Sequence, residues 1–188
     1  MTKTTIELSL VVPCYNEEHN LTDLFERLQS VLKPLNISYE IVCVNDGSQD
    51  NTFQCLVEHH NQNPIIKVVN LSRNFGKEAA LRAGLDHTKG AAAIIMDGDL
   101  QHPPSLLPEM IKSWFNGGYE IVEAVKTSRG DEKKISNFAA RYFYNLFERL
   151  SGLDLKGASD FKLLDKKVIT SIKNFNERSL FFRGMISW

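Results

Sequence analysis

Short apolar runs alternate with helical patterns along the first half of the chain. The apolar runs are typical of strands that are buried on both faces, and they cover residues 8–13, 40–45, 65–71 and 91–97. Helical spacing falls between them, at residues 21–32, 52–60 and 77–87, with Asn16 as a candidate N-cap before the first. This alternation predicts βαβ crossovers, and therefore an α/β fold with a mainly parallel, Rossmann-like sheet flanked by helices.

The pattern changes after about residue 125. Residues 135–150 carry an unbroken apolar and aromatic stripe at i, i+3, i+4 and i+7, which indicates one long amphipathic helix. Residues 160–164 have the character of a further strand, and Asp165 is placed to cap a last helix that reaches Lys173. Because no internal repeat or low-complexity linker divides the chain, we expect one domain over residues 1–188, with two functional halves that meet near residue 125.

Charge is unevenly distributed between these halves. The whole chain is nearly neutral, with 22 basic and 23 acidic residues, which argues against a general nucleic-acid-binding protein. Residues 1–125, however, hold 9 basic and 16 acidic residues, whereas residues 126–188 hold 13 and 7. An acidic half suits cation binding and a basic half suits phosphate or an anionic membrane surface, although scattered solvated charge also produces such splits.

The cysteines and the apolar segments bear on the cellular compartment. The three cysteines form no CxxC pair, and Cys14 and Cys43 lie in apolar runs, which predicts buried thiols in a reduced cytosolic protein. There is no signal-peptide pattern, and the apolar run at residues 91–96 is far shorter than the roughly 18 residues that a membrane span needs. Residues 181–188 are apolar with no polar tail, and we expect the natural chain to continue beyond Trp188.

Unusual polar residues follow each of the four predicted strands of the first half. They occur at residues 15–17, 46–48, 72–74 and 97–99. Ligands of parallel α/β sheets bind beyond the carboxyl ends of the strands. We therefore expect these four segments to converge on one rim of the sheet.

The last of these segments, Asp97-Gly98-Asp99, is a candidate metal site. Hard divalent cations such as Mg²⁺ and Mn²⁺ prefer carboxylate oxygens, and Gln101 adds another oxygen two residues later. His102-Pro103-Pro104 stiffens the exit of the segment because proline fixes φ. A lone DxD is weak evidence, since chance and turn formation also produce it.

Two other segments have two interpretations each. Asp46 begins a turn-rich segment that leads into a helix, and it is either a turn and capping residue or an acceptor for the groups of a nucleoside. Residues 13–17 are either a helix entry or a binding platform with an aromatic ring and a carboxylate.

Taken in order, these segments resemble family 2 of the inverting glycosyltransferases of GT-A fold. Within that family the chain is most similar to the polyprenyl-phosphate glycosyltransferases, such as bactoprenol glucosyltransferases and dolichol-phosphate mannose synthases. The resemblance covers essentially the whole chain and is most specific in Arg73-Asn74-Phe75-Gly76-Lys77 and Asp99-Leu100-Gln101-His102-Pro103-Pro104. The other segments that carry it are Pro13-x-Tyr15-Asn16-Glu17 and Asn45-Asp46-Gly47-Ser48 with Asp50 and Thr52.

The resemblance assigns roles to individual residues. It implies a nucleotide-sugar donor held by Pro13, Tyr15, Glu17, Asp46, Lys77, Asp97 and Arg183. It implies Mg²⁺ or Mn²⁺ bound by Asp99 and Gln101 together with Asp97, and Asp160 as the catalytic carboxylate. Arg129 is expected to meet phosphate, and Lys133 and Arg141 are further candidates on the acceptor side. Many relatives have glycine where Ser159 stands here, which affects the fine geometry around Asp160.

The implied activity is transfer of a hexose from a UDP- or GDP-sugar to polyprenyl phosphate, with inversion, at the cytoplasmic face of the cell membrane. The resemblance also implies membrane segments after the catalytic domain, beyond Trp188. One alternative is transfer to a sugar hydroxyl of a cell-envelope polysaccharide, for which Asp160 must act as general base. Another is a non-catalytic nucleotide-sugar-binding protein. The stripe at residues 135–150 either packs in the core or forms an interfacial helix that presents the lipid. A homo-oligomer is compatible with the sequence.

Overall fold

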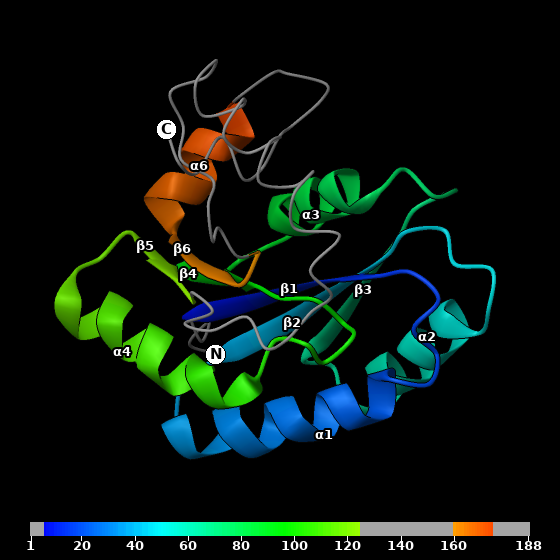
Figure 1. Cartoon of the computed structure of the whole chain (residues 1–188), viewed down its shortest axis with the longest axis horizontal. Helices are drawn as coiled ribbons and strands as arrows, with labels where there is room; N and C mark the ends of the chain where they lie inside the picture. The colour runs from blue at the N-terminus through cyan, green and yellow to red at the C-terminus, as the bar shows by residue number, and fades with distance from the viewer. Residues whose placement is uncertain (1–5, 125–159, 175–188) are drawn as a thin grey trace, which may run out of the picture.

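The computed structural model describes residues 6–124 and 160–174, which form a sheet between two layers of helices (Figure 1). The first half contains β1 (Leu8–Cys14), α1 (Leu21–Leu32), β2 (Tyr39–Asn45), α2 (Thr52–Gln62), β3 (Ile66–Asn70), α3 (Lys77–Asp86) and β4 (Ala92–Ile95). The remaining described elements are α4 (Leu107–Gly117), β5 (Ile121–Glu123), β6 (Lys162–Asp165) and α6 (Lys166–Asn174). Short 3-10 turns cover Lys33–Leu35 and Pro104–Leu106.

The strand order of the sheet is β3-β2-β1-β4-β6-β5. Strands β1 to β4 are parallel, and β1 pairs with β2 from Leu8↔Tyr39 to Cys14↔Asn45. Strand β6 runs antiparallel to both β4 and β5, and its first residue, Lys162, pairs with the last residue of β4, Ile95. The predicted α/β fold with a mainly parallel sheet is confirmed. Because β6 is reversed, the residues before it lie at the rim where β1 and β4 end.

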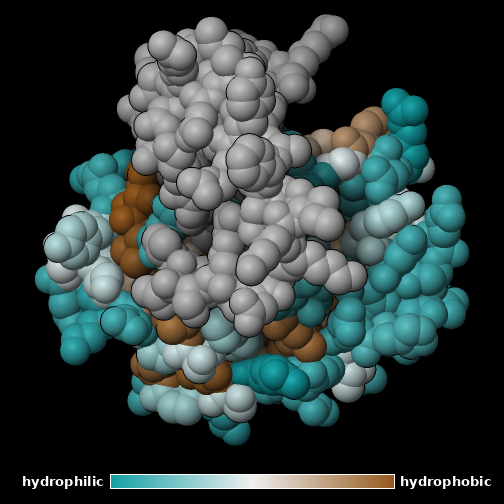
Figure 2. Space-filling model, viewed as in Figure 1, coloured by the Kyte–Doolittle hydropathy of each residue, from teal (hydrophilic) through white to brown (hydrophobic). Residues whose placement is uncertain are grey.

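Both faces of the sheet are covered. Helices α1, α2 and α4 lie on one face, and α3 and α6 lie on the other (Figure 1). Strand β1 alternates accordingly, with Leu10 and Val12 in the first core cluster and Val11 in the second. A fully buried aliphatic side chain contributes about 1.5–3 kcal/mol to folding, so burial on two faces accounts for the continuous apolar runs. The outer surface over α2 is almost wholly hydrophilic, whereas hydrophobic side chains appear between α1 and α4 (Figure 2).

Helix α1 buries its predicted stripe but begins later than the sequence suggests. Its buried residues are Leu21, Leu24, Phe25, Leu28 and Leu32. The prediction of Asn16 as its N-cap is wrong, because the cap residue is Asn20. Asn16 has φ of 56° and joins two loops instead: its N–H donates to Ser48 Oγ (3.0 Å) and its Oδ1 accepts from Gln49 N–H (2.8 Å).

The predicted cap of the last helix is confirmed. Asp165 Oδ1 accepts a hydrogen bond from Lys167 N–H at 2.9 Å, and its Oδ2 accepts one from the Trp114 indole at 2.8 Å. The strand before it begins at Lys162, two residues later than predicted. Helix α4 and strand β5 were not predicted, and the predicted helix at residues 135–150 lies outside the described residues.

The cysteine prediction is confirmed for burial. Cys14 and Cys43 are buried free thiols, and Cys55 is partly buried. A hydrogen bond with Cys43, together with burial, raises the pKa of Cys14 well above its ordinary value of 9.0. Within residues 6–124 and 160–174, no helix has the length and apolarity to cross a bilayer.

Candidate functional site

A pocket of about 320 Å³ opens where the parallel strands end. Its lining includes most of the donor-side and metal residues expected from the sequence, namely Pro13, Tyr15, Glu17, Asp46, Lys77, Asp97 and Asp99. Segments that follow β1, β2, β3 and β4 all contribute, so the expected convergence on one rim is confirmed. Gln101 is exposed and does not belong to the lining among the described residues.

The loops after β1 and β2 are tied together beside this pocket. Glu17 N–H donates to Thr52 Oγ1 at 2.7 Å, and Glu18 N–H donates to Asp50 Oδ2 at 3.3 Å. Burial acts to raise the pKa of Asp50, but hydrogen bonds from Thr52 outweigh it and lower that pKa. Asp50 and Thr52 therefore stabilise the structure of these loops. Tyr15 is exposed and lines the pocket.

Asp46 organises the loop that leads into α3. It is 3% exposed, and its Oδ1 and Oδ2 accept hydrogen bonds from Phe75 N–H (2.8 Å) and Gly76 N–H (2.9 Å). The next residue, Gly47, has φ of 64°, and a Cβ there would lie 2.2 Å from the carbonyl carbon of Arg73. The expectation of a simple turn or α2 cap is wrong, because Asp46 fixes a loop about thirty residues further along the chain. Asp46 is also one of the residues that line the pocket.

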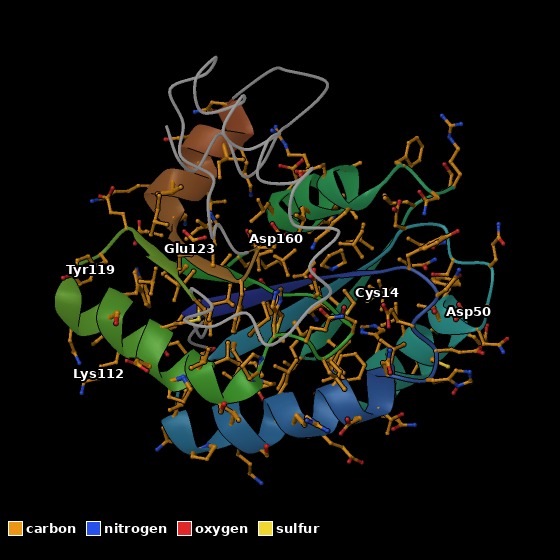
Figure 3. All side chains as sticks on the ribbon, viewed as in Figure 1. Cys14, Asp50, Lys112, Tyr119, Glu123 and Asp160 are labelled. Atoms are coloured by element: carbon orange, nitrogen blue, oxygen red, sulfur yellow. The ribbon has the colours of Figure 1, made fainter. Side chains whose placement is uncertain are left out.

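Lys77, the first residue of α3, bridges two carboxylates. Its Nζ lies 2.6 Å from Asp97 Oδ1 and 2.8 Å from Asp160 Oδ2. Burial acts to lower the pKa of Lys77, but hydrogen bonds and charge interactions with Asp160 and Asp97 outweigh it and raise that pKa. Asp160 lies beside α3 just before β6, with Glu123 near the end of neighbouring β5 (Figure 3). The structure therefore brings Asp160 to the same site as the donor-side residues.

His102 also contacts Asp97, a role that was not predicted from the sequence. Its Nδ1 accepts a hydrogen bond from Asp97 N–H at 3.0 Å, so the ring proton of the neutral form resides on Nε2. Burial lowers the pKa of His102, against the opposing charge of Asp97. The imidazole also stacks on Phe161. The signal in the sequence is a histidine three residues after the acidic turn, just before two prolines.

The two carboxylates of the acidic turn suit a divalent cation that takes its remaining ligands from substrate and water. Asp97 and Asp99 line the same pocket, and Asp99 Oδ1 accepts from Gln101 N–H at 3.0 Å. In residues 6–124 and 160–174, no three His, Cys, Asp or Glu side chains are grouped so as to hold a metal on their own. Protein-bound Mg²⁺ commonly uses one or two carboxylates and completes its shell with substrate phosphates and water. Two carboxylates fit a cation that arrives with a diphosphate.

The remaining candidates cannot be placed. Arg129, Lys133, Arg141 and Arg183 lie outside the described residues, and their roles stay predictions.

The fold and the comparisons with known proteins show which class of protein this chain belongs to. A Rossmann-like sheet with an acidic turn after its fourth strand is the architecture of GT-A glycosyltransferases, and a GT-A enzyme is among its structural neighbours. That neighbour is a mannosyltransferase of Pyrobaculum calidifontis solved with GDP-Man and Mn²⁺, with a TM-score of 0.61, 18% identity, and coverage of 88% of this chain and 46% of the other. The family model Glycosyl transferase family 2 matches residues 9–172, so the chain belongs to this family.

Two curated relatives agree with this assignment. An uncharacterized glycosyltransferase of Synechocystis is 49% identical over 98% of this chain and 58% of its own length. A bactoprenol glucosyl transferase of Shigella phage SfX is 37% identical over 97% of this chain and 60% of its own length. The chain thus spans somewhat over half the length of these relatives.

Proposed function

We propose that this chain transfers a hexose from a UDP- or GDP-sugar to polyprenyl phosphate, with inversion, at the cytoplasmic face of a membrane. The observation that carries the proposal is that Asp97, Asp99 and Lys77 line one pocket, and that Lys77 also forms an ion pair with Asp160. Similarity to a bactoprenol glucosyl transferase supports a lipid-phosphate acceptor. Transfer to a sugar hydroxyl remains the competing reaction that the experiment below tests.

The donor would lie in the pocket along the strand ends. The exposed ring of Tyr15 suits stacking on a nucleobase, and Pro13, Glu17 and Asp46 line the same wall. The Lys77 ammonium is placed to meet the donor diphosphate, and Arg183 is expected to add a charge-assisted contact. Asp97 and Asp99, with Gln101 as a further oxygen donor, would hold Mg²⁺ or Mn²⁺. Such a cation supplies Lewis-acid stabilisation of the charge that develops on the leaving diphosphate.

The acceptor chemistry decides the role of Asp160. The second pKa of a phosphate monoester is near 6, so a lipid phosphate is largely ionised at neutral pH and needs no general base. Its oxygen attacks the anomeric carbon from the face opposite the leaving diphosphate, which inverts the configuration. Asp160 then positions the acceptor. Arg129, Lys133 and Arg141 are proposed to offset the negative charge that would repel the acceptor phosphate.

Donor and metal can be tested first. UDP- and GDP-sugars are screened by thermal shift with Mn²⁺, since a ligand that binds the native state raises its melting temperature. The donor that stabilises the chain is then assayed for transfer to polyprenyl phosphate, with the anomeric configuration read by NMR. EDTA and Asp99→Ala should each abolish transfer, and full activity of Asp99→Ala would overturn the metal assignment.

The acceptor is tested in parallel. Asp160→Asn should lose turnover and keep donor affinity, whereas lost donor binding would contradict an acceptor-side role. Transfer to an oligosaccharide hydroxyl in place of polyprenyl phosphate would favour the competing reaction. Salt-sensitive binding to anionic liposomes tests the membrane location. Loss of this binding in Phe138→Ala or Phe143→Ala would assign the membrane contact to the predicted interfacial helix.

A further inference from the structure

We infer that Lys77 is an internal counter-cation that keeps divalent metal out of the empty site and gives way when a nucleoside diphosphate arrives. The metal and the diphosphate would therefore bind as coupled ligands. This inference rests on the proposed function, because it requires that a metal–diphosphate complex occupies this pocket.

The geometry of Lys77 is unusual for a residue that only binds substrate. Its ammonium contacts Asp97 at 2.6 Å and Asp160 at 2.8 Å, and these two carboxylates come from different segments, one after β4 and one before the neighbouring strand β6. The backbone before Lys77 is fixed, since Asp46 accepts from Phe75 N–H and Gly76 N–H. The side chain is 40% exposed and has a flexible four-carbon stem, so it can move while its backbone stays in place.

The charges explain why this contact opposes a metal. Glu17, Asp46, Asp97 and Asp99 line the pocket, and Lys77 alone is basic among the described residues that do so. Asp97 Oδ1 faces the ammonium, so a divalent cation must either displace Lys77 or lie beside a positive charge. Both cost free energy, because the first breaks two ion pairs and the second places like charges close together.

A diphosphate changes this balance. It brings negative charge to the pocket and gives the ammonium a new partner, so Lys77 can leave Asp97 and Asp160 without losing its own pairing. Asp97 can then bind the cation, and Asp160 can contact the acceptor. Because coupling between two ligands is reciprocal, the metal must also raise the affinity for the diphosphate.

The test measures Mn²⁺ binding by EPR, with no turnover, in the presence and absence of UDP or GDP. The wild-type chain should bind Mn²⁺ about tenfold or more tightly with the preferred nucleotide than alone, a typical coupling strength. Lys77→Met, which keeps the stem and removes the charge, should bind Mn²⁺ alone about tenfold more tightly than wild type and lose most of the coupling. Lys77→Arg should retain weak binding of Mn²⁺ alone.

Controls separate the possible failures. Lys112→Met removes an exposed lysine on α4, far from Asp160 (Figure 3), and should behave as wild type. Lys77→Gln repeats the charge removal with a polar side chain if the methionine variant fails to fold. Equal Mn²⁺ affinity in wild type and both neutral variants would overturn the inference and leave the proposed function standing. No Mn²⁺ binding by wild type with either nucleotide would overturn both.

Discussion

The imidazole of His102 lies nearly parallel to the phenyl ring of Phe161, with centroids 5.0 Å apart and an interplanar angle of 12°. His102 belongs to the segment after the acidic turn, and Phe161 follows Asp160 directly. The stack therefore joins the segment that is expected to hold metal to the segment that carries the expected catalytic carboxylate. His102 also accepts from Asp97 N–H, so one ring supports both sides of the site.

Two substitutions of His102 separate these contacts. His102→Phe keeps a ring against Phe161 but leaves Asp97 N–H without its acceptor, a loss of about 1–3 kcal/mol. We expect transfer to fall on the order of tenfold and the Mn²⁺ requirement to rise. His102→Asn keeps an acceptor near the Nδ1 position and loses the stack, so its Mn²⁺ requirement should stay close to that of wild type. The Mn²⁺ requirement is measured by steady-state kinetics at varied Mn²⁺ concentration. A larger increase for His102→Asn than for His102→Phe would contradict these separate roles of the two contacts.

Removal of the Asp46 carboxylate should loosen the start of α3. Asp46→Ala leaves Phe75 N–H and Gly76 N–H unpaired, and hydrogen bonds to charged groups contribute about 1.5–3 kcal/mol each. We expect the free energy of unfolding in urea to fall by about 3 kcal/mol, with weaker nucleotide binding because Lys77 is no longer held. Asp46→Asn, which keeps one acceptor, should lose less. Unchanged stability of the alanine variant would show that the loop is held by other contacts.

Asp165 should contribute stability that depends on pH. Burial acts to raise the pKa of this carboxyl, but hydrogen bonds from Lys167 N–H and the Trp114 indole outweigh it and lower the pKa below its ordinary 3.8. A lowered pKa in the folded state means that stabilisation is complete above the ordinary value and is lost as pH falls through the folded one. Asp165→Ala should cost about 1 kcal/mol at pH 7, as for other N-caps, and progressively less below about pH 4. Urea unfolding across that range measures the difference, and a pH-independent gap would contradict the account.

A buried carboxylate at the opposite end of the sheet gives a stability test independent of function. Glu40 is 1% exposed, and its Oε1 accepts from Ser9 Oγ and from Lys89 N–H, each at 2.7 Å. Its Oε2 is buried and without a hydrogen-bond partner in the described part of the chain. Glu40→Gln keeps the accepting oxygen and should stay within about 1 kcal/mol of wild type, whereas Glu40→Ala should lose about 3 kcal/mol. Thermal and urea unfolding that ranked the two variants equally would argue against a role for Oε1.

The rim of the site was predictable because its signals are local. An apolar run ends, polar residues follow, and the rule for parallel sheets places those residues together. Tyr15, Asp46 and Asp97 were found in this way, and all three line the pocket, whereas Lys77 was expected only from the family resemblance. The buried stripe of α1 and the cap at Asp165 follow from spacing within a few residues, which explains why they were also found.

The partners of these residues were not predictable because they are distant in sequence. Lys77 and Asp160 are 83 positions apart, and Asp46 lies 29 positions before Phe75. The spacing of residues within one helix or strand contains no information on which distant residue a side chain will contact. Asp46 was consequently interpreted as a local turn residue or a ligand contact, when its carboxylate spans two loops.

Two elements were missed for different reasons. Helix α4 has Pro108 in its first turn and follows Pro103 and Pro104, and prolines usually indicate that a helix is interrupted. The apolar spacing of its buried residues, Leu107, Met110 and Ile111, was therefore not interpreted as a helix. Proline is tolerated in the first turn of a helix, where its missing N–H would have no intrahelical partner. Strand β5 has three residues, too few to display an alternating pattern.

The reversed direction of β6 also bears on how relatives can diverge. Strand β5 ends at Glu123, Ala124 N–H donates to Phe161 O at 3.0 Å, and β6 starts two residues after Asp160. Ala124 and Phe161, which flank the stretch outside the described residues, therefore lie side by side. Insertions, deletions or wholesale exchange of the intervening stretch need not disturb the strand pairing on either side. Such a junction is a natural place to graft the corresponding stretch from a relative and ask whether acceptor preference travels with it.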